Sequence, residues 1–108
     1  MKKAYAIGQS DNVATALEAI SAGEEVEVVG EVRMTVEATT DIPDAHKIAL
    51  SAIAPGEGIF KLGTRIGTAK ADISPGEWVH LHNARSDYDA RAEGADVETG
   101  MMGDTTYE

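Results

Sequence analysis

The chain of 108 residues contains no cysteine, which excludes a disulfide framework, a thiolate metal site and a cysteine nucleophile. Aromatic residues make up only 5%, so a core must be built mainly from valine, isoleucine, leucine and alanine. No apolar run approaches the roughly 20 residues that a membrane-spanning helix requires. The apolar stretch behind the N-terminal lysines, residues 5–7, is too short for a signal peptide, so we expect a cytoplasmic protein.

Positive charge is also scarce. The formal net charge is −10, from 19 acids and nine bases. From Asp87 onward there are seven acids and one base, a net of −6, and residues 1–86 hold the other twelve acids and eight bases, a net of −4. Nucleic acids and anionic membrane surfaces require a basic surface on the protein, so this balance argues against both as partners.

The length and composition favour one soluble domain, which we place in residues 1–85. Residues 86–108 have few apolar side chains, scattered among Gly, Asp, Glu and Thr. Such a segment does not bury enough apolar surface to order itself, so we predict an acidic, flexible tail. The alternative is that its apolar residues dock on a partner or on the domain, namely Met101, Met102 and Tyr107.

One helix is predicted near the N-terminus, between residues 11 and 23. Asp11 or Asn12 is a suitable N-cap, because a side-chain oxygen there accepts a backbone N–H at the start of a helix. Gly23 stands where a C-cap glycine is expected. Between them the apolar residues recur at helical spacing, at Val13, Ala16, Leu17 and Ile20.

The rest of the domain has the pattern of short β-strands. Valine and methionine alternate with polar or charged residues over 26–28 and 32–36, with a bulge or turn expected at Gly30. Further strands are predicted at residues 3–7, 39–42, 47–49, 59–61, 65–69 and 78–82. The predicted fold class is therefore mainly β, with a single helix.

A similar sequence occurs three times, at residues 20–26, 53–59 and 73–79. Each copy has an apolar anchor, a turn that carries glycine, a glutamate and a return to an apolar residue, and proline–glycine in two copies fits a type II turn with positive φ at glycine. The copies are 33 and then 20 residues apart, so they do not form a solenoid. We interpret them as one turn that folds short strands over a β core, although such turns are common anyway. The glutamates are interpreted as exposed or salt-bridged rather than catalytic.

All three histidines lie in the second half of the domain. On a strand, His80 and His82 project from the same face as Trp78, and a His-x-His pair holds a divalent cation through neutral imidazole nitrogens. Two ligands are too few for a tight site, so we predict that His46 supplies the third, with zinc or ferrous iron as the metal. The alternative is three surface or hydrogen-bonding histidines.

Lys47 and Arg65 are cations on a mostly acidic body, and we predict that they bind a substrate carboxylate, Arg65 in a bidentate manner. The alternative is that both are solvated charges on strand faces. The sequence has no phosphate-binding loop, no Gly-x-Ser-x-Gly elbow and no His-Glu-x-x-His helix. Catalytic residues are therefore not assigned.

Four motifs, taken in order, resemble the SAF domain of the altronate and galactarate dehydratase family, and are also similar to the small subunit of sulfolactate sulfo-lyase. They are Ile42-Pro43-x-x-His46-Lys47-x-Ala49-Leu50, Ile53-x-x-Gly56-Glu57, Lys61-x-Gly63-x-x-Ile66-Gly67-x-Ala69 and Ile73-x-x-Gly76-Glu77-x-Val79-His80-x-His82-Asn83. The resemblance covers about residues 5–84. The chain departs from the family at Ala45, where glycine is usual, so a slightly altered loop backbone is expected.

The resemblance implies a compact β-clip fold beside a much larger catalytic domain, here expected as a separate large dehydratase subunit. The family reaction is an elimination from a polyhydroxylated or sulfonated carboxylic acid with iron(II) or another divalent metal. A base removes the proton α to the carboxylate, and the β group leaves as water or sulfite. By this resemblance His46, His80 and His82 are expected to help bind the metal, and Lys47 to help hold the acid.

We therefore expect the small subunit of a two-subunit, metal-dependent lyase that eliminates water from a sugar acid and is not active alone. A sulfolactate sulfo-lyase small subunit is the close alternative. A non-catalytic binding or assembly module is a second class of function, and absence of metal from the purified protein would favour it. An enzyme acting alone is not expected, because the sequence lacks an evident base and a carboxylate-lined cleft.

Overall fold

The computed structural model describes residues 1–86, which form two β-sheets and no helix. The larger sheet has the order β4-β3-β1-β2-β5-β8. Its strands are β1 (Lys2–Ala6), β2 (Val13–Ala16), β3 (Glu25–Gly30), β4 (Met34–Glu37), β5 (Lys47–Ala49) and β8 (Trp78–Val79). The smaller sheet has the order β6-β7-β9, formed by β6 (Gly58–Lys61), β7 (Thr64–Ala69) and β9 (Ala84–Ser86).

The prediction of a mainly β fold is confirmed. The described part of the chain offers no helix with the length and apolar character needed to cross a bilayer. The predicted tail lies outside the described residues from position 87 onward, and its first residue, Ser86, is the buried last residue of β9.

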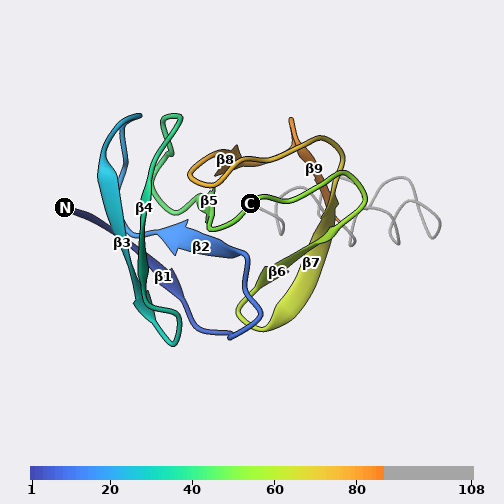
Figure 1. Cartoon of the computed structure of the whole chain (residues 1–108), viewed down its shortest axis with the longest axis horizontal. Helices are drawn as coiled ribbons and strands as arrows, with labels where there is room; N and C mark the ends of the chain where they lie inside the picture. Colours follow the sequence, from blue (N-terminus) through green and yellow to red (C-terminus); the bar gives the residue numbers. More distant parts are fainter. Residues whose placement is uncertain (87–108) are drawn as a thin grey trace, which may run out of the picture.

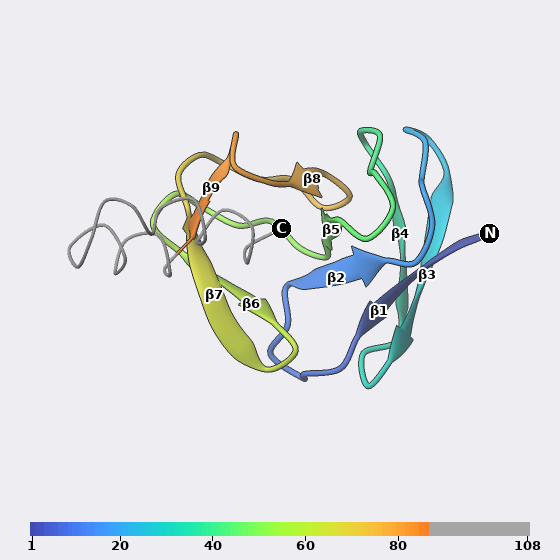
Figure 2. The same ribbon diagram turned by 180° about the vertical axis from the view of Figure 1, so that it is seen from behind.

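Two hydrophobic clusters lie on opposite sides of the β2–β5 pair, because successive residues of a strand project to opposite faces. Ala14 and Ile48 belong to the first cluster, whereas Val13 and Ala49 belong to the second. Residues of β1, β3 and β4 complete the first cluster, and residues of β6, β7 and β9 complete the second. Figure 1 shows these two groups of strands on either side of β2 and β5, and Figure 2 shows the same arrangement from behind.

The predicted helix between residues 11 and 23 is wrong, because this segment contains β2. One edge of β2 pairs with β1 and the other pairs with β5, where Ala14 lies opposite Ile48. Leu17, on the expected apolar face of the helix, is 53% exposed, whereas Ala14, which lies off that face, is buried. Pairing on both edges of the strand therefore overrides the local helical spacing.

The residues expected to cap that helix instead join the two sheets. The Asp11 carboxylate accepts backbone N–H groups from Gly8, Leu62 and Gly63 at 2.8–3.0 Å. The Asn12 amide both donates to and accepts from the backbone of β6, at 2.9 and 2.8 Å. Leu62 and Gly63 form the tip of the β6–β7 hairpin with positive φ angles of 54° and 77°, so Asp11 stabilises a strained turn.

The three predicted turns are confirmed. Their glycines have φ angles of 86–91°, at Gly23, Gly56 and Gly76. In each turn the glutamate Oε1 accepts the N–H of the residue three positions earlier, at 2.7–2.8 Å, from Glu24, Glu57 and Glu77. These glutamates are therefore structural turn caps.

A fourth copy of the turn, not predicted, lies at residues 42–46. Ala45 occupies the glycine position with φ of 70°, and His46 occupies the glutamate position. The His46 N–H donates to the Pro43 carbonyl at 3.1 Å, like the 3.0–3.1 Å bonds made by the glutamate N–H groups of the other copies. Ala45 thus adopts the left-handed backbone that glycine adopts in the other three turns.

The four turns are joined in pairs by two isolated bridges, Ile20 with Ile42 and Ile53 with Ile73. The second bridge repeats the first at offsets of 33 and 31 residues. Equivalent backbone bonds surround both bridges, for example from Gly23 N–H to the Ala38 carbonyl and from Gly56 N–H to the Ala69 carbonyl. Residues 17–49 and 50–80 therefore share one backbone plan.

Other predicted strands differ from the observed strands in where they begin or end. The strand expected at residues 39–42 is reduced to the bridge at Ile42, and the strand expected at 32–36 begins only at Met34. The strand β9 was not predicted, because its buried residues, Ala84 and Ser86, are too small to give an apolar pattern.

Candidate functional site

His46 differs from the glutamates of the other turns because of Pro43. A glutamate in this position caps the N–H three residues earlier, and proline has no N–H to cap. The His46 imidazole instead turns to Trp78, whose Nε1–H donates to His46 Nδ1 at 3.1 Å. The His46 backbone is fixed from the other side, since its carbonyl accepts the Ala16 N–H at 2.8 Å.

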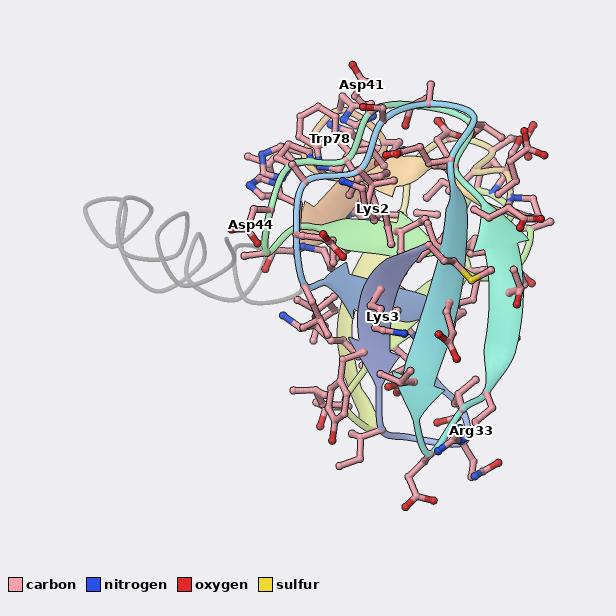
Figure 3. All side chains as sticks on the ribbon, turned by 90° about the vertical axis from the view of Figure 1, so that its left-hand side faces the viewer. Lys2, Lys3, Arg33, Asp41, Asp44 and Trp78 are labelled. Atoms are coloured by element: carbon pink, nitrogen blue, oxygen red, sulfur yellow. The ribbon has the colours of Figure 1, made fainter. Side chains whose placement is uncertain are left out.

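Four rings meet at the β8 edge of the larger sheet, and we call His46, Trp78, His80 and His82 the ring cluster. Trp78 and His80 are stacked, with ring centroids 5.2 Å apart and planes 9° apart. His46 lies 5.6 Å from Trp78 and 5.1 Å from His80, and His82 lies 5.2 Å from Trp78. Figure 3 places Trp78 at the same end of the molecule as Asp41. The structure thus brings together all three histidines.

A turn, and not the strand predicted at residues 78–82, positions the last two histidines. The strand β8 ends at Val79, and residues 80–83 turn the chain. The Asn83 side chain closes this turn, because its Oδ1 accepts the His80 N–H at 3.0 Å and its Nδ2 donates to the Trp78 carbonyl at 2.9 Å. Asn83 is only 3% exposed, so its amide is committed to these backbone groups.

Trp78 and Asn83 are the site residues to which the sequence analysis gave no role. Trp78 was placed beside the histidines by strand alternation, and Asn83 ends the fourth family motif. Neither signal indicated a function. Recognising that the Asn83 amide closes a turn requires knowing where β8 ends.

Lys47 follows His46 in the chain but does not join the ring cluster. It pairs with Thr15 of β2 on one side and Val79 of β8 on the other, and it is only 2% exposed. Lys47 is therefore not the solvated charge that was considered as an alternative. A buried ammonium requires compensating partners, and Lys47 does interact with other groups of the fold.

Arg65 lies in β7 of the smaller sheet, and the structure does not place it in the ring cluster. Its side chain is exposed and donates from Nη2 to the Thr68 hydroxyl at 3.1 Å. The tip of its hairpin lies beside the β1–β2 loop, at the end of the molecule opposite β8 (Figures 1 and 2). The two predicted substrate-binding cations therefore occupy different environments.

The ring cluster alone does not fit a complete metal site. In the part of the chain that the structure describes, no group of three or more His, Asp or Glu side chains is arranged to hold a metal ion. The 5.1 Å separation of the His46 and His80 rings is close to the roughly 5 Å expected for two imidazoles on one zinc ion. However, the Trp78 N–H occupies His46 Nδ1. Metal binding by His46, His80 and His82 stays a prediction.

A hollow of about 390 Å³ lies over the bridge between Ile53 and Ile73. Glu57 and Asp72 contribute carboxylates to its lining, which contains no cation. A carboxylic acid would be repelled there, so this hollow does not suit the substrate class expected from the sequence.

A separate ion pair joins β1 and β3 on the outer face of the larger sheet, where Lys3 lies opposite Glu27. The hydrogen bond from Lys3 and its positive charge lower the pKa of the Glu27 carboxyl below its usual value. Both side chains are exposed to solvent, so the pair adds little stability. Figure 3 shows Lys3 on the strands below the end that carries Trp78.

Comparison with known proteins adds a family match over nearly all of the described residues. A model described as the altronate/galactarate dehydratase SAF domain matches residues 2–87. The altronate dehydratase of Bacillus subtilis (strain 168) is 41% identical over 86 residues, which are 80% of this chain and 17% of that protein. The altronate dehydratase of Escherichia coli (strain K12) is 45% identical over 76 residues, which are 70% of this chain and 15% of that protein.

The third relative has a different reaction in its name. The (2R)-sulfolactate sulfo-lyase subunit alpha of Paracoccus pantotrophus is 39% identical over 54 residues, which are 50% of this chain and 78% of that subunit. The chain therefore spans less than a fifth of each altronate dehydratase but matches more than three quarters of the sulfo-lyase subunit.

Proposed function

Because the chain belongs to the altronate/galactarate dehydratase SAF-domain family, we propose that it is the SAF component of a lyase that eliminates water from a sugar acid. The observation that carries this proposal is the contact between the His46 and His80 rings, whose centroids lie 5.1 Å apart. These residues come from two separate stretches of the region that matches the family, and they converge with Trp78 in one polar cluster.

The proposed partner is a separate large dehydratase subunit that supplies the catalytic base. Each altronate dehydratase contains a large part outside the matched region, which supports the need for a catalytic part beyond the SAF domain. The sulfo-lyase relative supports a division into subunits, because that protein is by its name one subunit of an enzyme.

In the proposed reaction the partner's base removes the proton α to the carboxylate. The electrons of the broken C–H bond form a double bond between the α and β carbons, and the β C–O bond breaks. The leaving hydroxide takes up a proton and departs as water. We assign to the ring cluster the task of holding the acid's oxygen atoms by hydrogen bonds, which is within the chemistry of imidazole N–H groups.

A divalent metal, with iron(II) as the first candidate, would supply a Lewis acid for the carboxylate or the leaving oxygen. His80 and His82 are the residues that would hold it, together with ligands from the partner, because the ring cluster does not complete a ligand set. Lys47 would contribute positive charge from inside the fold. Arg65 would meet the acid only if the partner brings it to the β6–β7 hairpin.

A second candidate function is that of a sulfolactate sulfo-lyase small subunit, in which sulfite leaves in place of water. The 78% coverage of the sulfo-lyase subunit favours it. A non-catalytic binding or assembly module is the third candidate, and it would not depend on the histidines.

The test is coexpression of the full chain with a large dehydratase subunit, followed by assay of the copurified pair on altronate, galactarate and sulfolactate. We expect water elimination from a sugar acid by the pair and by neither chain alone. The variant His80→Gln with His82→Gln is expected to bind the partner normally and to lose at least about 10-fold in kcat/KM. Consumption of sulfolactate alone would assign the second candidate function, and full activity of the double variant would contradict a role for these histidines.

A further inference from the structure

The hydrogen bond between Trp78 and His46 determines where the His46 proton resides. An indole Nε1–H is a donor only, so the His46 Nδ1 that receives it must present a lone pair. A neutral imidazole carries one proton, and that proton must then lie on Nε2. Neutral His46 is therefore the Nε2–H tautomer.

Both partners of this bond are held by the backbone. His46 ends the fourth turn, and its carbonyl is bonded to β2. Trp78 lies in β8 opposite Ile48, its backbone N–H donates to the Thr40 hydroxyl at 3.0 Å, and its ring stacks on His80. A donor and an acceptor held from several sides lose little conformational entropy in meeting, so the tautomer is fixed in advance of ligand binding.

We propose that His46 binds an oxygen atom of the substrate acid through its Nε2–H, and that Trp78 is the positioning residue that sets this tautomer. The identity of the acid rests on the function proposed above, whereas the tautomer does not. Among the four equivalent turn positions, three carry carboxylates, which when ionised only accept hydrogen bonds. His46 is the one that presents a donor.

The hydrogen bond from Trp78 also prevents His46 from acting as a metal ligand together with the other two histidines. A metal ligand needs a lone pair on nitrogen, and in this tautomer Nδ1 shares its lone pair with the indole while Nε2 carries a proton. His46 is thus a hydrogen-bond donor, and a metal at this end of the molecule would use His80 and His82 with ligands from outside the ring cluster.

The tautomer is measurable by two-bond ¹H–¹⁵N NMR correlation on the full ¹⁵N-labelled chain at about pH 8.5, where an ordinary imidazole is neutral. We expect an unprotonated Nδ1 and a protonated Nε2 for His46, unchanged when Zn²⁺ is added. Trp78→Phe keeps a ring but removes the N–H, and it is expected to give a mixture of tautomers. Tyr5→Phe, on the exposed face of β1, is the matched control and should leave the His46 signals unchanged.

A protonated Nδ1 in the unmodified chain, or a shift of either His46 nitrogen to a metal-bound position with Zn²⁺, would overturn the assignment. In the reconstituted pair, His46→Gln retains an N–H donor and should keep at least about 10-fold more kcat/KM than His46→Glu, which has only acceptors at neutral pH. Equal loss in both variants would overturn substrate binding by His46. If no pair acts on any acid, the proposed function fails while the NMR result still decides the tautomer.

Discussion

Residues 17–49 and residues 50–80 share one backbone plan around two bridges, and they differ in chemistry at the second turn of each half. In the later half that turn has Gly76 followed by Glu77, and the carboxylate caps the Ser74 N–H. In the earlier half it has Ala45 followed by His46, and the imidazole contacts Trp78. One half therefore uses this position to stabilise a turn, and the other uses it to build the ring cluster.

The difference shows how a structural position becomes available for binding. Pro43 removes the N–H that a cap would satisfy, and its fixed φ keeps the turn in place without that bond. The side chain at position 46 then has no N–H to cap, so the turn does not require a carboxylate there. The residue after it diverges as well, since Lys47 corresponds to Trp78 of the later half, so the two halves together supply the cluster and the buried cation.

The largest expected effect is at Gly76. A Cβ added there would lie 2.0 Å from the Glu37 carbonyl oxygen, whereas at Gly56, with nearly the same φ, it would meet no atom within 4 Å. Gly56→Ala should lower the free energy of unfolding by about 0.5 kcal/mol, because the positive φ costs roughly 1–2 kcal/mol and the loss of glycine's freedom in the unfolded chain offsets about 0.5–1 kcal/mol of that. Gly76→Ala should lower it by about 3 kcal/mol or more. Urea unfolding of both variants measures the difference, and equal losses would show that the close approach at Gly76 is relieved by a small backbone shift.

A smaller effect is expected from removing one turn cap. Glu57→Ala leaves the Ala54 N–H without its carboxylate partner and should destabilise the chain by about 1 kcal/mol. Glu57→Gln keeps an acceptor oxygen in the same place and is the matched control, with an expected loss below about 0.5 kcal/mol. If the two variants unfold at the same urea concentration, the glutamates are not caps and the contrast with His46 loses its basis.

A substitution at Ala45 is expected to stabilise the chain, whereas those at the turn glycines and at Glu57 destabilise it. The φ of 70° at Ala45 places a side chain in the left-handed region, which costs roughly 1–2 kcal/mol, whereas glycine in the unfolded chain costs about 0.5–1 kcal/mol more entropy. Ala45→Gly should therefore raise the free energy of unfolding by about 0.5 kcal/mol. Thermal and urea unfolding measure it, with Ala54→Gly, in the equivalent half but outside the glycine position, as a control that should not stabilise the chain.

The sequence predicted those parts of the fold in which one local pattern has one structural solution. Alternating valines located β3 and β4 because one face of each strand is buried, and the Gly–Glu turns were recognised because positive φ favours glycine. The segment that became β2 was misassigned because helical spacing says nothing about strands that pair on both of its edges. The fourth turn was missed because alanine and histidine replace its two signature residues.

The site was predictable only in part for the same reason. The convergence of the histidines was expected, whereas the Asn83 turn and the burial of Lys47 depend on where β8 ends and on a second core behind β5. The residues next to Asn83 and Lys47 in the sequence do not determine these two features. Contacts between distant segments determine them, and the spacing of residues along the chain does not reveal such contacts.

The smallest effect is expected from a test of whether the missing Pro43 N–H is the reason that position 46 has no capping role. His46→Glu alone should gain no cap, because Pro43 has no N–H to donate. Pro43→Ser restores that N–H, as in the turn where the Ser21 N–H bonds Glu24. The double variant should therefore be about 0.5 kcal/mol more stable than the sum of the two single changes predicts, measured as the coupling energy of a double-mutant cycle in urea. The same cycle with His46→Leu, which offers no acceptor, should give no coupling. Coupling in the leucine cycle, or none in the glutamate cycle, would mean that something other than the missing N–H releases His46 from the turn.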